Sequence, residues 1–135
     1  PDRVEDERWN LELAQLMLNA RKYAKAEAYA QKVLKSKKTA HRSRAALLIA
    51  SAQELGDRVA LAKKTYENLL NEKNLPDDLK QIATVSLAHC LEKMGQLKAA
   101  RVAYLDAQKA TKNSRFLDSR IQRIERLIQE QTGDK

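Results

Sequence analysis

The sequence predicts an all-α protein, and three observations support this prediction. Strong helix formers dominate the chain, which has only three Gly and two Pro among 135 residues. Apolar side chains recur at helical spacing through most of the sequence. The same pattern of two helical segments joined by a short turn occurs three times. We therefore expect seven helices, arranged as three antiparallel pairs and a last helix that caps them.

The third repeat, residues 77–112, is the clearest. Its first half places Leu87 and Leu91 on one helical face. Gly95 follows, and glycine readily adopts the left-handed conformation that ends a helix. The small Ala100 lies near the start of the second half, so two antiparallel helices can approach closely there.

The pattern recurs in residues 7–38 and 40–75. The anchor alanines Ala26, Ala62 and Ala100 follow one another at nearly equal separations along the chain. We expect all three to be buried where the two helices of a pair meet.

The two upstream turns differ from the third. Arg21 stands where the turn of the first repeat would have a glycine. In the second repeat we take Gly56 as the turn glycine and expect one extra residue before the next helix, in the segment Gly56–Val59.

The last helix is expected at residues 114–131, with an apolar stripe on one side. Its other side is polar, as the terminal unit of a helical array requires. A half-exposed docking helix is the alternative. The stripe consists of Leu117, Ile121, Ile124 and Ile128, with Leu127 beside it. The expected helix caps are Thr39, Asp77 or Asp78, and Asn113 or Ser114.

These residues resemble the tetratricopeptide repeat family, in which an Ala is followed four residues later by an aromatic in the second helix. Ala62 with Tyr66, and Ala100 with Tyr104, match this pattern, whereas Ala30 replaces the aromatic in the first repeat. The repeats are longer than those of the family and lack its usual proline. The resemblance spans nearly the whole chain. It implies a single domain, residues 1–135, in which the pairs form a right-handed superhelix.

The resemblance also implies a groove lined by the first helices of the pairs. Some family members bind a C-terminal carboxylate there with Lys, Arg and Asn, and this chain lacks that set. We therefore expect an extended peptide or amphipathic helix with apolar anchors as the ligand. The residues expected in the groove are Leu11, Gln15, Leu18, Asn19, Ala46, Ala50, Gln53, Val85, Ser86, His89, Glu92 and Lys93.

The chain carries a net charge of +8, and no acidic residue lies between Glu27 and Glu54. The basic residues of this stretch form either a solvated loop or a docking patch for an acidic protein, a lipid headgroup layer or nucleic acid. Nucleic acid is not expected, because the stretch lacks aromatic side chains between its charges and matches no nucleic-acid-binding motif. The expected basic patch is Lys35, Lys37, Lys38, His41, Arg42 and Arg44.

Residues with catalytic chemistry are few. His89 and Cys90 are adjacent, but neighbours on a helix point about 100° apart. Cys90 is therefore interpreted as a packing residue, and Asp77 and Asp78 as helix-capping residues. No metal-ligand spacing and no phosphate-binding glycine loop is present, so we expect neither an enzyme nor a metal or cofactor.

The sequence thus favours a scaffold or adaptor that binds a protein or peptide, with an acidic partner favoured and no small-molecule substrate. One alternative is self-association into a homodimer, through the last helix or through Trp9, which we otherwise expect in the core of the first repeat. A second alternative is a binder of nucleic acid or of an anionic surface through the basic residues from Lys35 to Arg44. We expect a cytoplasmic protein. An extracytoplasmic domain behind an upstream anchor is the alternative.

Overall fold

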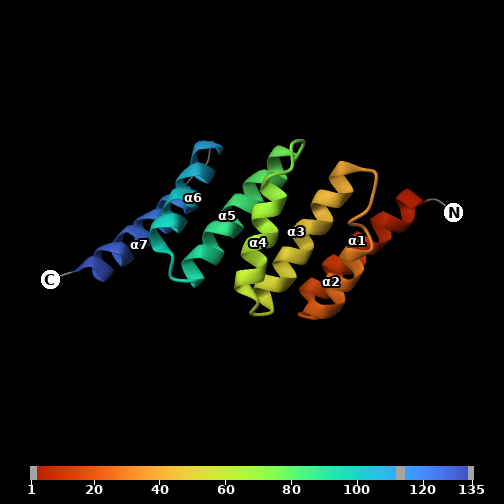
Figure 1. Ribbon diagram of the computed structural model, residues 1–135, viewed down its shortest axis with the longest axis horizontal. Helices are drawn as coiled ribbons and strands as arrows, with labels where there is room; N and C mark the ends of the chain where they lie inside the picture. The colour runs from red at the N-terminus through yellow and green to blue at the C-terminus, as the bar shows by residue number, and fades with distance from the viewer. Residues whose placement is uncertain (1–2, 112–114, 134–135) are drawn as a thin grey trace.

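A computed structural model describes residues 3–111 and 115–133, and all regular secondary structure in this part of the chain is helical. The all-α class and the seven helices expected from the sequence are confirmed. Consecutive helices run antiparallel along the molecule (Figure 1). The helices are α1 (Arg3–Asn19), α2 (Tyr23–Gln31), α3 (Thr39–Leu55), α4 (Val59–Leu70), α5 (Asp77–Lys93), α6 (Leu97–Lys109) and α7 (Arg115–Thr132).

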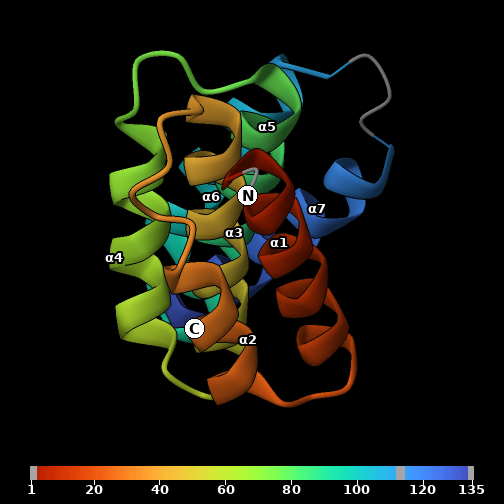
Figure 2. The same ribbon diagram turned by 90° about the vertical axis from the view of Figure 1, so that its right-hand side faces the viewer.

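The helices form two layers. Each even helix packs on the odd helix before it and on the odd helix after it. The odd helices also contact one another, because α3 touches both α1 and α5 directly. In the end-on view, α2 and α4 lie on one side while α1 and α7 lie on the other (Figure 2). One surface of the protein is therefore built mainly by the odd helices.

The three anchor alanines, Ala26, Ala62 and Ala100, are fully buried, as predicted. Two further core side chains, Tyr66 and Tyr104, follow four residues after the second and third anchors and are also buried. A methyl group at each anchor lets the paired helices approach, and the large aromatic ring then fills the space beside it.

The turns inside the three pairs share one geometry. In each turn a single residue has a positive φ, and these are Arg21 (63°), Asp57 (67°) and Gly95 (77°). The next residue donates its backbone N–H to a carbonyl oxygen five positions earlier, at 2.8, 2.8 and 2.9 Å respectively. This contact is the six-to-one hydrogen bond of a Schellman helix end.

The expected extra residue in the second turn is therefore wrong. Asp57, not Gly56, is the equivalent of Gly95. Gly56 has an ordinary negative φ of −87° and ends α3. Aspartate tolerates the left-handed region better than most residues, so the turn needs no glycine at that position.

The expected helix caps at Thr39 and Asp77 are also wrong, because both residues are already the first residue of a helix. Pro76 occupies the cap position of α5, where its fixed φ and missing N–H suit the start of a helix. Asp78 lies inside the first turn, and its Oδ1 accepts the N–H of Leu79 at 2.9 Å. The expected cap of α7, Asn113 or Ser114, lies outside the described residues.

The helix α7 covers the end of the third pair. Its buried residues Leu117, Ile121 and Ile124 pack in one cluster with Leu91 and Tyr104. Among the described residues, no helix has both the length and the apolar character required to cross a membrane.

Candidate binding face

The residues predicted to line a groove are only partly at the surface. Leu11, Ala50 and Gln53 are buried, so they cannot contact a ligand in this conformation. Ala50 packs in a core cluster, and Gln53 accepts a hydrogen bond from Thr65 of α4 at 2.7 Å. Ala46 is half-buried beside the same core cluster. The prediction that Leu11, Ala50 and Gln53 line a groove is therefore wrong.

The uncovered row of α3 lies one residue further along. The separation of the anchors Ala62 and Ala100 relates each exposed position of α5 to an equivalent position of α3. Subtracting this separation from the numbers of Val85, His89 and Lys93, which face outward on α5, gives the residues of α3 that face outward. That row is Leu47, Ser51 and Leu55, and each of these side chains is partly or fully exposed.

Outward-facing rows of three odd helices define a surface that we call the odd-helix face. All of its members are at least partly exposed. It consists of Arg44, Leu47, Ser51 and Leu55 on α3, Ile82, Val85, His89 and Lys93 on α5, and Phe116, Arg120, Arg123 and Leu127 on α7.

The other predicted groove residues lie on α1 and α5. Gln15 and Asn19 remain accessible on α1, where Gln15 Nε2 donates to Asn19 Oδ1 at 3.0 Å. Leu18 is half-buried and packs against the core cluster that contains Leu11 and Ala30. Ser86 and Glu92 are half-buried on α5.

A buried carboxylate joins α3 to α5 beneath the face. Glu54 is 7% exposed, and its Oε2 accepts a hydrogen bond from Nδ1 of His89 at 2.7 Å. Lys93 Nζ lies 3.4 Å from the same oxygen. Tyr66 donates its hydroxyl hydrogen to Glu54 Oε1 at 3.2 Å from the other side. These bonds fix the orientation of His89 and Lys93 on the odd-helix face.

A second carboxylate joins α5 to α7 in the same way. Glu92 accepts a hydrogen bond from Tyr104 at 3.0 Å and forms an ion pair with Arg123 at 2.6 Å. On the odd-helix face, Arg44 and Arg120 add two further positive charges. The face is therefore basic, because the two acids beneath it balance only some of its cations.

Large apolar side chains are also exposed on the odd-helix face. Leu55 is 50% exposed, Ile82 49% and Phe116 54%. The guanidinium of Arg120 lies 5.9 Å from the Phe116 ring centre, one helical turn away. Apolar groups of this size remain largely in contact with water, so covering them would be favourable.

The predicted basic patch divides into two groups. Lys35, Lys37, Lys38 and Arg44 are exposed. His41 and Arg42 are half-buried and hold the connection between the first two pairs. His41 Nδ1 lies 2.8 Å from Glu7 Oε1, and Arg42 Nη1 donates to the carbonyl oxygen of Ser36 at 2.7 Å.

Cys90 packs as a core residue. It is fully buried, and burial, together with the negative charge of Glu54, raises the pKa of its thiol to about 12. The thiol therefore stays protonated at neutral pH. In the described ranges, no three His, Cys, Asp or Glu side chains converge as metal ligands would.

The expectation that Trp9 belongs to the core is wrong, because this side chain is 63% exposed on α1.

Comparisons of the chain with protein-family models, with curated proteins and with solved structures found no match.

Proposed function

We propose that the protein is a helical-repeat adaptor, similar to tetratricopeptide arrays, that binds an acidic peptide segment along the odd-helix face. The main support is the exposure of Leu55, Ile82 and Phe116 on three helices of one surface. Completing the burial of one half-exposed side chain of this size contributes about 1 kcal/mol. Several such contacts are needed for useful affinity, and the face offers them on three adjacent helices.

The charge of the face selects the class of ligand. Arg44, Lys93 and Arg123 are exposed on the same face as the apolar residues, and they attract an acidic segment before contact and repel a basic one. The ligand therefore carries Asp or Glu between apolar side chains. His89 and Lys93 are held by Glu54, so they need little ordering when a ligand binds.

The test is selection of short random peptides that are displayed on phage and captured by the purified protein. We expect the selected peptides to be acidic, with apolar residues at intervals. Ile82→Ser and Phe116→Ser should each weaken binding of a selected peptide about fivefold, from the loss of roughly 1 kcal/mol of apolar contact.

The matched control is Leu61→Ser, which removes a comparably exposed leucine (42%) from α4. This change should leave peptide affinity unaltered. The proposal fails if the selected peptides carry no acidic bias, or if Leu61→Ser weakens binding as much as Ile82→Ser.

A further inference from the structure

The first helix presents a core-like row that the described chain leaves largely uncovered. Trp9, Leu13 and Leu16 are spaced for one face of α1, and Trp9 and Leu16 are 63% and 58% exposed. The equivalent rows of the later odd helices are covered by the preceding even helix. On α3 the row is Ala45 and Ile49, which pack in one cluster with α2 residues, and Ala52, which is fully buried and lies near α2. On α5 it is Ala83, Leu87 and Cys90, packed against α4.

Acidic side chains surround this row. Glu5, Asp6 and Glu12 are exposed on α1, and Arg8 is the exposed cation among them. We call this surface, with Trp9 and Leu16, the head. The head is negatively charged although the chain as a whole carries +8.

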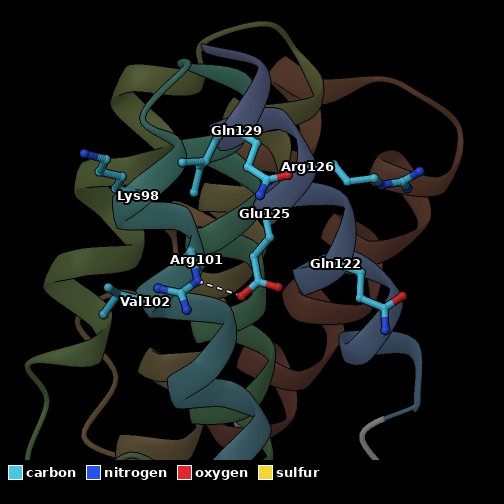
Figure 3. A pocket seen from close by; sticks show the side chains of 8 residues that line it. Lys98, Arg101, Val102, Gln122, Glu125, Arg126 and Gln129 are labelled. Atoms are coloured by element: carbon cyan, nitrogen blue, oxygen red, sulfur yellow. Dashed lines mark hydrogen bonds and ion pairs between the residues drawn. The ribbon is translucent and has the colours of Figure 1, made fainter. Parts of the chain in front are cut away.

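At the opposite end of the array, too, no helix among residues 3–111 and 115–133 covers the last one. A hollow of about 940 Å³ lies between α6 and α7 (Figure 3). The starts of α5 and α7, Asp77 and Arg115, are as far apart along the chain as the anchors Ala62 and Ala100, so α7 corresponds to the first helix of a fourth pair. In the third pair, α6 covers the equivalent side of α5. The hollow is therefore where the second helix of a fourth pair would lie.

The hollow combines apolar and basic side chains. Val102 is 56% exposed and Ile128 is half-buried. Arg101 pairs with Glu125 at 3.0 Å, while Lys98 and Arg126 add two positive charges. Figure 3 shows Lys98 and Arg126 on opposite sides of the Arg101–Glu125 pair. We call this surface, defined by Lys98, Arg101, Val102, Gln122, Glu125, Arg126, Ile128 and Gln129, the tail.

We propose that the head of one copy of the protein binds the tail of another. Trp9 then packs on Val102 and Ile128, where it also approaches guanidinium groups that interact favourably with its ring. Acidic side chains of the head lie near Lys98 and Arg126. The proposal goes beyond peptide binding and uses other surfaces, so the odd-helix face remains open in the assembly.

The contact joins two different surfaces, so a pair of copies joined by it still has one free head and one free tail. Each bound copy still has one unoccupied head or tail, and the assembly grows as a chain unless it closes into a ring. The mass in solution should therefore exceed twice that of the monomer as concentration rises. Added sodium chloride should reduce it, because the contact pairs opposite charges at the surface.

The first experiment measures the mass of the whole chain by light scattering over a concentration series at low salt. The fluorescence of Trp9, the only Trp, should shift to shorter wavelength as the mass increases. A constant monomer mass up to the highest concentration would overturn the proposal, as would a mass that stops rising at that of a dimer.

The second experiment uses one variant of each surface. Trp9→Glu and Val102→Glu should each be monomeric, and an equimolar mixture should form a dimer and nothing larger. In that mixture only Val102→Glu carries a Trp, so its emission should shift when Trp9→Glu is added. Leu61→Glu on α4 is the matched control and should assemble as the original chain does.

Both changed side chains are exposed, so the variants should keep the original helix content and melting temperature. If Val102→Glu alone still assembles, the contact is head to head and the proposal is wrong. If the mixture stays monomeric while both variants are folded, head and tail do not bind each other.

Discussion

Tyr104 donates its hydroxyl hydrogen to Glu92 Oε1 at 3.0 Å, and in the preceding helix pair Tyr66 donates to Glu54 in the same way at 3.2 Å. In both pairs the tyrosine lies on the even helix and the glutamate on the preceding odd helix. A basic residue of the next odd helix then pairs with the same glutamate, which is Arg123 in the later case. Each of these carboxylates therefore connects three helices.

Removing the tyrosine hydroxyls should destabilise the fold. Tyr104→Phe and Tyr66→Phe should each lower the free energy of unfolding by about 1 kcal/mol, because a half-buried or buried carboxylate loses one donor but keeps its cation. Urea denaturation followed by circular dichroism measures this. Tyr23→Phe is the control and should change stability by less than about 0.5 kcal/mol. Equal effects in all three variants would show that the shared hydroxyl contact is not stabilising.

Enlarging an anchor alanine should separate its helix pair. Ala100→Leu places extra methylene groups in a fully buried site and should cost about 1–3 kcal/mol. Ala99→Leu, one residue earlier on the exposed side of α6, should change the free energy of unfolding by less than about 0.5 kcal/mol. Thermal and urea melts of the two variants give the comparison. Similar melts would mean that close approach at Ala100 is unimportant.

Glycine should be favoured at the left-handed turn positions, so removing it from one and introducing it at another should have opposite effects on stability. Gly95→Ala should destabilise the protein by about 1 kcal/mol through backbone conformation alone, because a Cβ there meets nothing within 4 Å. Arg21→Gly should stabilise it by about 0.5 kcal/mol, since φ is 63° at Arg21. The neighbouring change Lys22→Gly, at a φ of −99°, should not stabilise it. The melting temperature of each variant shows whether its stability has risen or fallen.

Acid should weaken the junction of the first two pairs. Hydrogen bonds from His41 first, and then from Ser36, lower the pKa of Glu7 below its ordinary value. A carboxyl with a lowered folded-state pKa adds stability above its unfolded pKa and loses it as the pH falls through the folded value. The loss of stability from neutral pH to about pH 3 should therefore be smaller in Glu7→Gln than in the original chain. Melts across this range test the difference, with the exposed neighbour Glu5 changed to Gln as control. An unchanged acid dependence in Glu7→Gln would contradict the prediction.

The sequence was sufficient for the helix pairs because their anchors are visible as alanines at regular separations. It failed for the exposed surface of α3 at one identifiable point. Taking Gly56, in place of Asp57, as the equivalent of Gly95 shifts the register by one residue. One residue rotates a helical position by about 100°, which turns the outward row containing Ser51 into the buried row containing Ala50.

The exposure of Trp9 could not be predicted for a different reason. The row Trp9, Leu13 and Leu16 has the pattern of a core-facing helix side. Whether such a row is covered depends on a helix before it in the array, and local periodicity does not contain that information.

The stacking of the helices also determines how the molecule opens. Among the described residues, the main contacts join helices that are neighbours along the chain or separated by one helix, and none of them joins α1 to α7. Such a structure forms from local contacts and unravels from its ends inward. Backbone amides of α1 and α7 should exchange with deuterated solvent first, and those of α3 and α4 last, so protection should rise toward the middle of the array.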